Sequence, residues 1–419
     1  MNKTIFVYAN WIRMDEPILM GKLHSQITRG EEIFSFEHNQ TWLESSYAHQ
    51  IDPDLQLYSG RQYLNDKEKS NFGIFLDSSP DRWGRLLMKR REAIIAKQEN
   101  RTEKKLIESD FLLGVFDEYR IGAIRFKENS DGPFLNNNQD FAAPPWTKIR
   151  ELEEMSLKLE DKSINDNNEI LKWIKMLLAP GASLGGARPK SSVCDTNNNL
   201  WIAKFPSKSD ISDIGCWEKV TNELATLCGI KVAEGQIKKL SSQHHTYLTK
   251  RFDRTNDHKR IHFASAMTLL GYTDGTDFHD GVSYLELAEF IIKNGAHANN
   301  DLEELWKRIV FSICVSNTDD HLRNHGFLLT DRGWMLSPAY DINPNEDGHG
   351  LSLNISETSN DLNLDLAMDV HEYFRIDKQK AKYIMEKIKE VVATWKDVAK
   401  KYGISSAEQD LKATAFQNF

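Results

Sequence analysis

The spacing of apolar residues changes along the chain. Every second residue tends to be apolar in three segments, at 3–11, 191–206 and 232–254. Apolar residues recur every three to four positions in six others, at 148–161, 169–180, 216–230, 283–295, 302–317 and 378–403. Side chains alternate between faces in a strand and repeat every 3.6 residues in a helix. The chain is therefore predicted to become β-rich from about residue 181 and mainly helical after about residue 256.

These elements divide the chain into predicted domains. Residues 111–126 combine glycines with alternating apolar residues, which predicts a turn and a strand. The Asn-, Pro- and Gly-rich stretch at 127–146 is typical of a linker or an exposed loop. We expect an α+β fold with a small α/β domain at 1–135, a β-rich lobe at 136–255 and a helical lobe at 256–419. A cleft would lie between the two lobes.

The composition excludes several classes of protein. Of the 419 residues, 40% are hydrophobic and 27% are charged, which fits neither a disordered polymer nor a membrane bundle. No window reaches the roughly eighteen apolar residues of a spanning helix, and residues 1–11 lack the features of a secretory signal. The four cysteines form no C-x-x-C pair. We expect a cytoplasmic protein without a membrane segment.

The charge distribution has one local exception. The formal net charge of -9 argues against a chain that coats nucleic acid along its whole surface. Residues 82–105, however, carry nine Lys or Arg against three Glu, with apolar residues at helical spacing. This pattern predicts an amphipathic helix with a basic outer face, which is either simply solvated or lies near DNA.

Three oxygen-bearing side chains surround one short segment. Asp319 and Asn324 are separated as D-x-x-x-x-N, the separation between the base and a metal-binding Asn in protein kinases. Residues 326–338 predict a hairpin that would return Asp341 to the side of Asn324. Carboxylate and amide oxygens are the ligands that Mg²⁺ prefers. The same residue types are also ordinary turn formers, so a hydrated loop is the alternative.

Two upstream features could bind a nucleotide phosphate. The stretch "GASLGGARPK" at 181–190 is rich in glycine, which lets backbone N–H groups approach a phosphate, although it matches neither common nucleotide motif. Lys204 lies on the second strand of the following hairpin, where protein kinases keep a phosphate-binding lysine paired with a Glu of the next helix. That helix offers Glu218 or Glu223.

His321 and His325 permit another interpretation. With Asp319 or Asp320 they could bind zinc and activate water in a hydrolase. They fall in a predicted loop and not on one helical face, so we favour His321 as a hydrogen-bonding brace of the loop.

Seven motifs in succession resemble the HipA family of bacterial serine/threonine protein kinase toxins. They are "SPDRWGRLLMKRRE", "LLGVFDEYRIGAIRF", "SLGGARPK", "WIAKFP", "LTKRFDR", "NTDDHLRNHGFLL" and "LSPAYDINP". The resemblance covers nearly the whole chain. It implies a two-lobed kinase fold with a small N-terminal domain, using ATP and Mg²⁺.

The resemblance also implies residue roles. Asp319 would be the base, and Asn324 and Asp341 would bind magnesium. Lys204 would contact the α and β phosphates, with Glu218 as its ion-pair partner and Glu223 as the alternative partner. The other implied nucleotide contacts are Ser183, Gly185, Gly186, Ala187, Lys250, Phe252, Asp253 and His321. Ser183 corresponds to the autophosphorylation site of the family, where added negative charge would repel the nucleotide. The neighbouring Asp320 departs from the usual pattern and could raise the pKa of either carboxyl group.

At the level of function, the resemblance implies the toxin of a type II toxin–antitoxin module. Its partners would be a HipB-like DNA-binding antitoxin and a protein substrate, such as an aminoacyl-tRNA synthetase or another translation component, with DNA contacted only through the antitoxin complex. Two alternatives remain. One is a kinase of a small molecule such as a sugar or aminoglycoside, and the other is a non-catalytic module that docks to the antitoxin and its DNA.

Overall fold

The computed structural model describes residues 2–64, 66–138, 144–161, 166–177, 186 and 188–418. The chain packs into two compact units. Unit 1 consists of Met1–Lys208, Asp253–Ala264 and Gly271–Thr273, and unit 2 consists of Ser209–Phe252, Ser265–Leu270 and Asp274–Phe419. Unit 1 continues past residue 135 without a division, and the three-domain boundaries stay a prediction.

Unit 1 contains an antiparallel sheet with the strand order β4-β3-β2-β1-β5. The strands are β1 Asn2–Ala9, β2 Ile18–Thr28, β3 Glu31–His38, β4 Arg61–Tyr63 and β5 Ile124–Lys127. Arg29 and Gly30 both have positive φ, at 54° and 86°, and join β2 to β3 as a two-residue turn. Such turns match the twist of the strands they connect. One sheet face buries Val7, Leu23 and Phe36.

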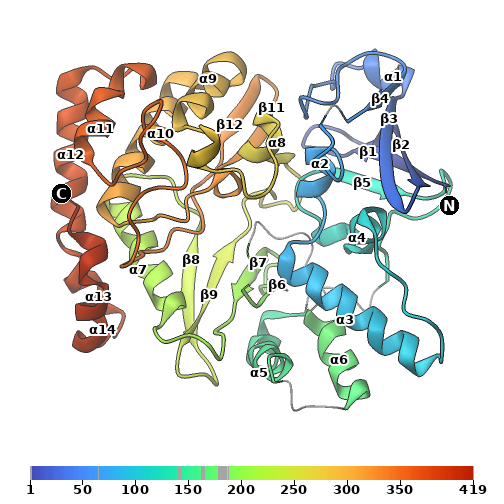
Figure 1. Ribbon diagram of the computed structural model, residues 1–419, viewed down its shortest axis with the longest axis horizontal. Coiled ribbons are helices and arrows are strands. Elements are labelled where there is room, and N and C mark those ends of the chain that lie inside the picture. The colour runs from blue at the N-terminus through green and yellow to red at the C-terminus, as the bar shows by residue number, and fades with distance from the viewer. Residues whose placement is uncertain are drawn as a thin grey trace. The chain divides into compact units, whose positions relative to one another are not determined.

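Among the described residues of unit 1, four helices precede β5 along the chain, and two follow it (Figure 1). They are α1 Gln40–Leu43, α2 Gly73–Asp77, α3 Arg82–Gln98, α4 Glu108–Gly114, α5 Ile149–Leu159 and α6 Asn167–Leu177. The basic segment is helical only to Gln98. The turn and strand predicted at 111–126 are present at Gly122–Ala123 and at β5, whereas the first residues of this stretch end helix α4, which buries Phe111 and Leu112.

The hairpin predicted at 191–206 is confirmed as β6 Lys190–Cys194 and β7 Leu200–Lys204. Its turn is held by Asp195, whose Oδ1 accepts the backbone N–H groups of Asn197 and Asn199 at 2.8 and 2.9 Å. Asn198 takes the left-handed conformation, φ 60°, which Asn tolerates better than most residues. Local turn chemistry therefore sets the position of Lys204 at the end of β7.

Unit 2 is mainly helical, as predicted. It contains α7 Ile214–Leu227, α8 Ala266–Leu270, α9 Tyr284–Asn294, α10 Ala298–Cys314, α11 Leu364–Asp369, α12 Lys378–Val392, α13 Trp395–Lys401 and α14 Ser406–Lys412. Two hairpins accompany them, β8 Gly235–Lys239 with β9 His245–Lys250, and β11 Gly326–Thr330 with β12 Gly333–Leu336. Helix α10 is the core helix, since its last seven residues are all buried. Within the described residues, no helix is long and apolar enough to span a bilayer.

The ends of α7 and α12 differ in how far the sequence reveals them. Gly229 follows α7 with φ 74°, the left-handed conformation in which helices commonly end. The periodic stretch at 378–403 is not one helix, because α12 ends at Val392 and α13 begins at Trp395. The apolar spacing persists through the break, so periodicity alone could not reveal it. The helices α12, α13 and α14 follow one another along one side of unit 2 (Figure 1).

Candidate active site

A loop after α10 carries the proposed base. Asn317, at the start of this loop, is buried, and its Oδ1 accepts the backbone N–H of Asn343 at 3.0 Å. Tyr340 donates its hydroxyl to the backbone carbonyl of Arg323 at 2.7 Å. The structure therefore brings the loop beside the segment that carries Asp341, as the predicted hairpin required.

Asp319 is presented outward from this loop. Its side chain is 85% exposed, and His321 Nε2 lies 3.9 Å from its Oδ1. The backbone carbonyl of Asp319 accepts a 2.8 Å hydrogen bond from Asn324 Nδ2. This bond closes the D-x-x-x-x-N segment into one turn, with an accessible carboxylate at one end and the amide of Asn324 at the other.

The other half of the Asn324 amide suits a cation. Asn324 is only 4% exposed, and within the described part of the chain its Oδ1 has no hydrogen-bond partner. A buried polar atom without a partner costs free energy unless another group satisfies it. Mg²⁺ prefers oxygen ligands of this kind, so the residues present fit a magnesium ion.

Asp341 has a constrained backbone, with φ 59° in the left-handed region. Its Oδ1 accepts a 3.4 Å hydrogen bond from Asn343 Nδ2. The next residue is tied to α7, because Thr221 Oγ1 donates to the carbonyl of Ile342 at 2.6 Å. Helix α7 therefore fixes the chain direction at the second proposed magnesium ligand.

The two candidate glutamates of α7 have different surroundings. Burial raises the pKa of Tyr247, and the carboxylates of Glu218 and Asp341 raise it further, so both lie near this phenol. Glu223 instead accepts hydrogen bonds from Lys401 and Tyr402. Burial alone would raise the pKa of Glu223, but these two donors outweigh it and lower the pKa. Glu223 thus has partners of its own within unit 2, and the pairing of Glu218 with Lys204 stays a prediction.

The nucleotide-binding residues proposed in unit 1 are described in part. Lys204 is buried and lies opposite Lys190 in the β6–β7 register. Gly186 is exposed with φ 87°, whereas Ser183, Gly185 and Ala187 lie outside the described residues. Lys204 belongs to unit 1, but Asp319, Asn324 and Asp341 belong to unit 2. The convergence of all four stays a prediction.

The "LTKRFDR" motif spans the boundary between the units. Lys250 and Phe252 belong to unit 2, where the Phe252 ring lies 5.5 Å from the Tyr340 ring. Asp253 belongs to unit 1 and is buried, and its Oδ2 accepts from Gly122 N at 2.8 Å and Arg254 Nη1 at 2.7 Å. A structural role thus occupies this carboxylate oxygen, and its contact with a ribose stays a prediction.

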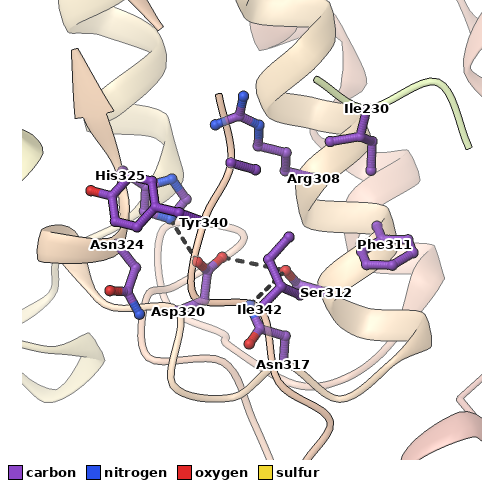
Figure 2. Close-up of a pocket in the computed structure, with 11 residues that line it drawn as sticks. Ile230, Arg308, Phe311, Ser312, Asn317, Asp320, Asn324, His325, Tyr340 and Ile342 are labelled. Carbon is purple, nitrogen blue, oxygen red and sulfur yellow. Dashed lines mark hydrogen bonds and ion pairs between the residues drawn. The ribbon is translucent and has the colours of Figure 1, made fainter. Parts of the chain in front are cut away.

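Asp320 is turned the opposite way from Asp319. It lines a small pocket of about 10 Å³. Ser312, Asn317, Asn324 and His325 line the same pocket (Figure 2). This is roughly the space of one water molecule, which is too small for a nucleotide. Burial alone would raise the pKa of Asp320, but His325 and Tyr284 outweigh it and lower the pKa. The expectation that the added carboxylate raises its pKa is therefore wrong for Asp320.

This pKa shift gives a prediction about stability and pH. The folded-state pKa of Asp320 lies below its ordinary value of 3.8, so its ionisation stabilises the fold above that value. This contribution is lost as the pH falls through the lower folded-state pKa. We expect the difference in unfolding free energy between wild type and Asp320→Asn to stay nearly constant above about pH 5 and to shrink as the pH falls further, measured by urea unfolding from pH 7 to about pH 2. A difference that grows in acid would contradict the assignment.

The zinc interpretation has no support from geometry. Within the described residues, the closely spaced group of His, Cys, Asp and Glu ligands is Asp213, Cys216 and His245, at the start of α7. His321 and His325 are not part of such a group. His325 is buried with its Nε2 3.0 Å from Asp320 Oδ1.

The comparisons with known proteins agree on a family. The model of the HipA-like C-terminal domain matches residues 182–395, just over half of the chain. The chain belongs to the HipA-like family. The matched range includes the loop of Asp319, the Asp341 segment and the β6–β7 hairpin, and five of the seven motifs lie within it.

A solved structure supports the same HipA-like fold along the full chain. The HipA of Shewanella oneidensis MR-1, solved with HipB and its operator DNA, has a TM-score of 0.62 at 17% identity. The match covers 99% of this chain and 95% of that one. The protein therefore has a mixed α/β, kinase-like fold with antiparallel sheets.

Two further similarities are partial. A Haemophilus influenzae protein that bears the name of a kinase is 26% identical to this chain over 180 residues. The match covers 39% of this chain and 52% of the length of that relative. The proinflammatory kinase CtkA of Helicobacter pylori matches 54% of this chain and 92% of its own at 15% identity and a TM-score of 0.35.

Proposed function

We propose that this protein transfers the γ-phosphoryl group of ATP to a serine or threonine hydroxyl of another protein. The observation that carries the proposal is the turn between Asp319 and Asn324. It exposes one carboxylate and leaves one buried amide oxygen without a partner among the described residues. Such a pair supplies both a base for the acceptor hydroxyl and a ligand for magnesium.

The proposed roles follow the chemistry of each group. Asp319 orients and deprotonates the acceptor, Asn324 and Asp341 bind Mg²⁺, and Lys204 contacts the α and β phosphates. Glu218 orients Lys204, His321 braces the loop, and the backbones of Lys250 and Phe252 meet the adenine. Catalysis would come mainly from positioning and from neutralising phosphate charge, because an in-line phosphoryl transfer needs little covalent chemistry from the protein.

In the cell, we propose a toxin that a HipB-like antitoxin restrains. The support is the family membership and the fold shared with a HipA that was solved with HipB and operator DNA. Phosphorylation of Ser183 would switch the toxin off by adding negative charge to a loop that binds phosphate. A translation component such as an aminoacyl-tRNA synthetase is the proposed class of substrate.

Labelled ATP separates this proposal from a small-molecule kinase. The purified protein is incubated with γ-labelled ATP, Mg²⁺ and a cell lysate, and the products are divided into protein and metabolite fractions. We expect the label on protein. A label found only on metabolites would favour the sugar or aminoglycoside alternative, and no transfer at all would contradict both.

The docking alternative depends on the basic segment, and the structure weakens it. Arg85 forms a bidentate pair with Glu108 at 2.6 and 2.7 Å, and Arg101 pairs with Glu92 and Glu99. Part of the basic charge is therefore paired within unit 1. If toxicity survives the Asp319→Ala change in the expressed protein, docking and not phosphoryl transfer explains it.

Asn324 gives a prediction about metal dependence. Replacing it with Ala removes the buried oxygen, so we expect the Mg²⁺ concentration needed for half-maximal activity to rise by at least about tenfold. The measurement is a magnesium titration at fixed ATP. Asn300→Ala, at an exposed position of α10, is the control and should leave the titration unchanged. Equal magnesium requirements for both variants would remove Asn324 from the metal site.

A further inference from the structure

Three separate elements converge on the buried carboxylate of Asp320. Tyr284, at the start of α9, donates its hydroxyl to Oδ2 at 2.7 Å. Ser312, in the last turns of α10, donates its hydroxyl to the same oxygen at 3.4 Å. His325, just before β11, places Nε2 3.0 Å from Oδ1. Figure 2 shows the contacts of Asp320 with His325 and Ser312 behind the loop.

The buried pair of Asp320 and His325 lies next in the chain to Asp319 and Asn324, the pair at the proposed active site. Asp319 and Asp320 are neighbours in the chain, as are Asn324 and His325. Asn324 bonds to the carbonyl of Asp319 at 2.8 Å, while His325 pairs with the side chain of Asp320. The Asp319 side chain is 85% exposed, but those of Asp320 and His325 are only 8% and 2% exposed. The buried contact between Asp320 and His325 therefore holds both ends of the segment that carries the proposed base and metal ligand.

The contacts of Asp320 with its neighbours are of the kind that can hold the loop in one position. A buried carboxylate is costly to keep unless it is paired and hydrogen-bonded. The imidazole of His325 and the hydroxyl of Tyr284 lower the pKa of Asp320 and so favour its ionised form. Hydrogen bonds to a charged group are stronger than those between neutral groups. Moving the loop would therefore break several strong contacts at once.

We propose that Asp320, paired with His325 and held by Tyr284, is a positioning residue for phosphoryl transfer. It holds the turn closed so that Asp319 faces the acceptor hydroxyl while Asn324 faces the metal. Asp320 itself touches neither substrate nor metal. The inference rests on the proposed kinase function and extends it to a buried residue.

The main test is Asp320→Asn, which keeps the size of the side chain and removes its charge. We expect kcat to fall by about 10²-fold, because a displacement of about 1 Å at a reacting group can cost that much. The KM for ATP should change much less than kcat, since the proposed nucleotide contacts Lys204, Lys250 and Phe252 lie outside the loosened turn. His325→Gln should have a similar effect, and the double variant should be little worse than either single variant, because both changes break one contact.

Asp301→Asn is the matched control. Asp301 is also a buried carboxylate of unit 2, and it accepts the backbone N–H of Leu336 at 3.0 Å. Its loss should lower stability without a specific fall in kcat. If Asp320→Asn lowers activity only in proportion to the unfolded fraction, as Asp301→Asn would, Asp320 is merely structural and the proposal is overturned.

Hydrogen exchange supplies a measurement that does not depend on catalysis. The backbone N–H of Asn324 donates to the backbone carbonyl of His321 at 2.8 Å within the turn. Asp320→Asn should speed exchange of the amides at 319–325, whereas Asp301→Asn should not. Unchanged exchange would overturn the anchor. Wild-type protein that transfers no phosphate would contradict the proposed function, and faster exchange in the variant would then still support the anchoring of the loop.

Discussion

Replacing Asp319 with Asn is expected to lower the rate of phosphoryl transfer by about 10²- to 10⁴-fold, the usual contribution of a positioned base. Asn keeps the shape of the side chain but cannot accept the proton of the acceptor hydroxyl at neutral pH. Because the carboxylate is 85% exposed, the free energy of unfolding should change by no more than about 0.5 kcal/mol. Initial rates at saturating Mg²⁺ and ATP, together with urea unfolding, measure both effects.

Asp331→Asn provides the control for this experiment. Asp331 is an exposed aspartate in the turn between β11 and β12 of the same unit, and it has no proposed role. It should retain the wild-type rate. If Asp319→Asn retains more than about a tenth of that rate, Asp319 does not act as the base.

Replacing Asp81 with Asn is expected to destabilise unit 1 by about 3 to 5 kcal/mol, the cost of breaking a buried ion pair from one side. Asp81 Oδ2 lies 3.0 Å from Lys190 Nζ, and the two side chains are only 3% and 6% exposed. Asn can still cap α3 through Gly84 N, which now bonds to Asp81 Oδ1 at 2.8 Å, so the cap is preserved. The loss is measured as a shift in the urea midpoint at constant slope.

An exposed ion pair of the same unit is the control. Lys208 Nζ and Asp161 Oδ2 are 2.9 Å apart, but their side chains are 49% and 38% exposed. Asp161→Asn should cost at most about 1 kcal/mol, because solvent screens surface pairs. If the two variants lost the same free energy of unfolding, burial would not account for the contribution of Asp81 to stability.

The Asp81–Lys190 pair has a consequence for the proposed nucleotide site. Lys190 ends the glycine-rich stretch and begins β6, and Trp83 Nε1 donates to its backbone carbonyl at 3.1 Å. The start of α3 therefore holds the first residue of the hairpin that carries Lys204. Residues of the motif "SPDRWGRLL" therefore contact a residue more than a hundred positions further along the chain. No local sequence pattern reveals this contact.

Local patterns predicted much of the fold. The β6–β7 and β11–β12 hairpins both depend on residues near each other in the sequence. Turn residues and short spacings encode such features directly. The hairpin after Asn324 also correctly brought the Asp341 segment beside the loop.

Long-range contacts decided what the sequence could not. Two adjacent aspartates look alike, and only Tyr284 on α9 and Ser312 on α10 determine that Asp320 is buried while Asp319 is exposed. The two glutamates of α7 are likewise distinguished by Lys401 and Tyr402, far along the chain. The sequence did show a second carboxylate, Asp320, beside the proposed base. Whether its side chain points outward or inward depends on tertiary packing.

The central claim is that this chain phosphorylates proteins through Asp319. Phosphopeptide mass spectrometry of cells that express the wild-type protein, compared with cells that express Asp319→Asn at the same level, tests it most directly. The account predicts new phosphoserine or phosphothreonine sites, including Ser183 of the chain itself, that appear only with the wild-type protein. Identical phosphopeptides from the two cultures would contradict it.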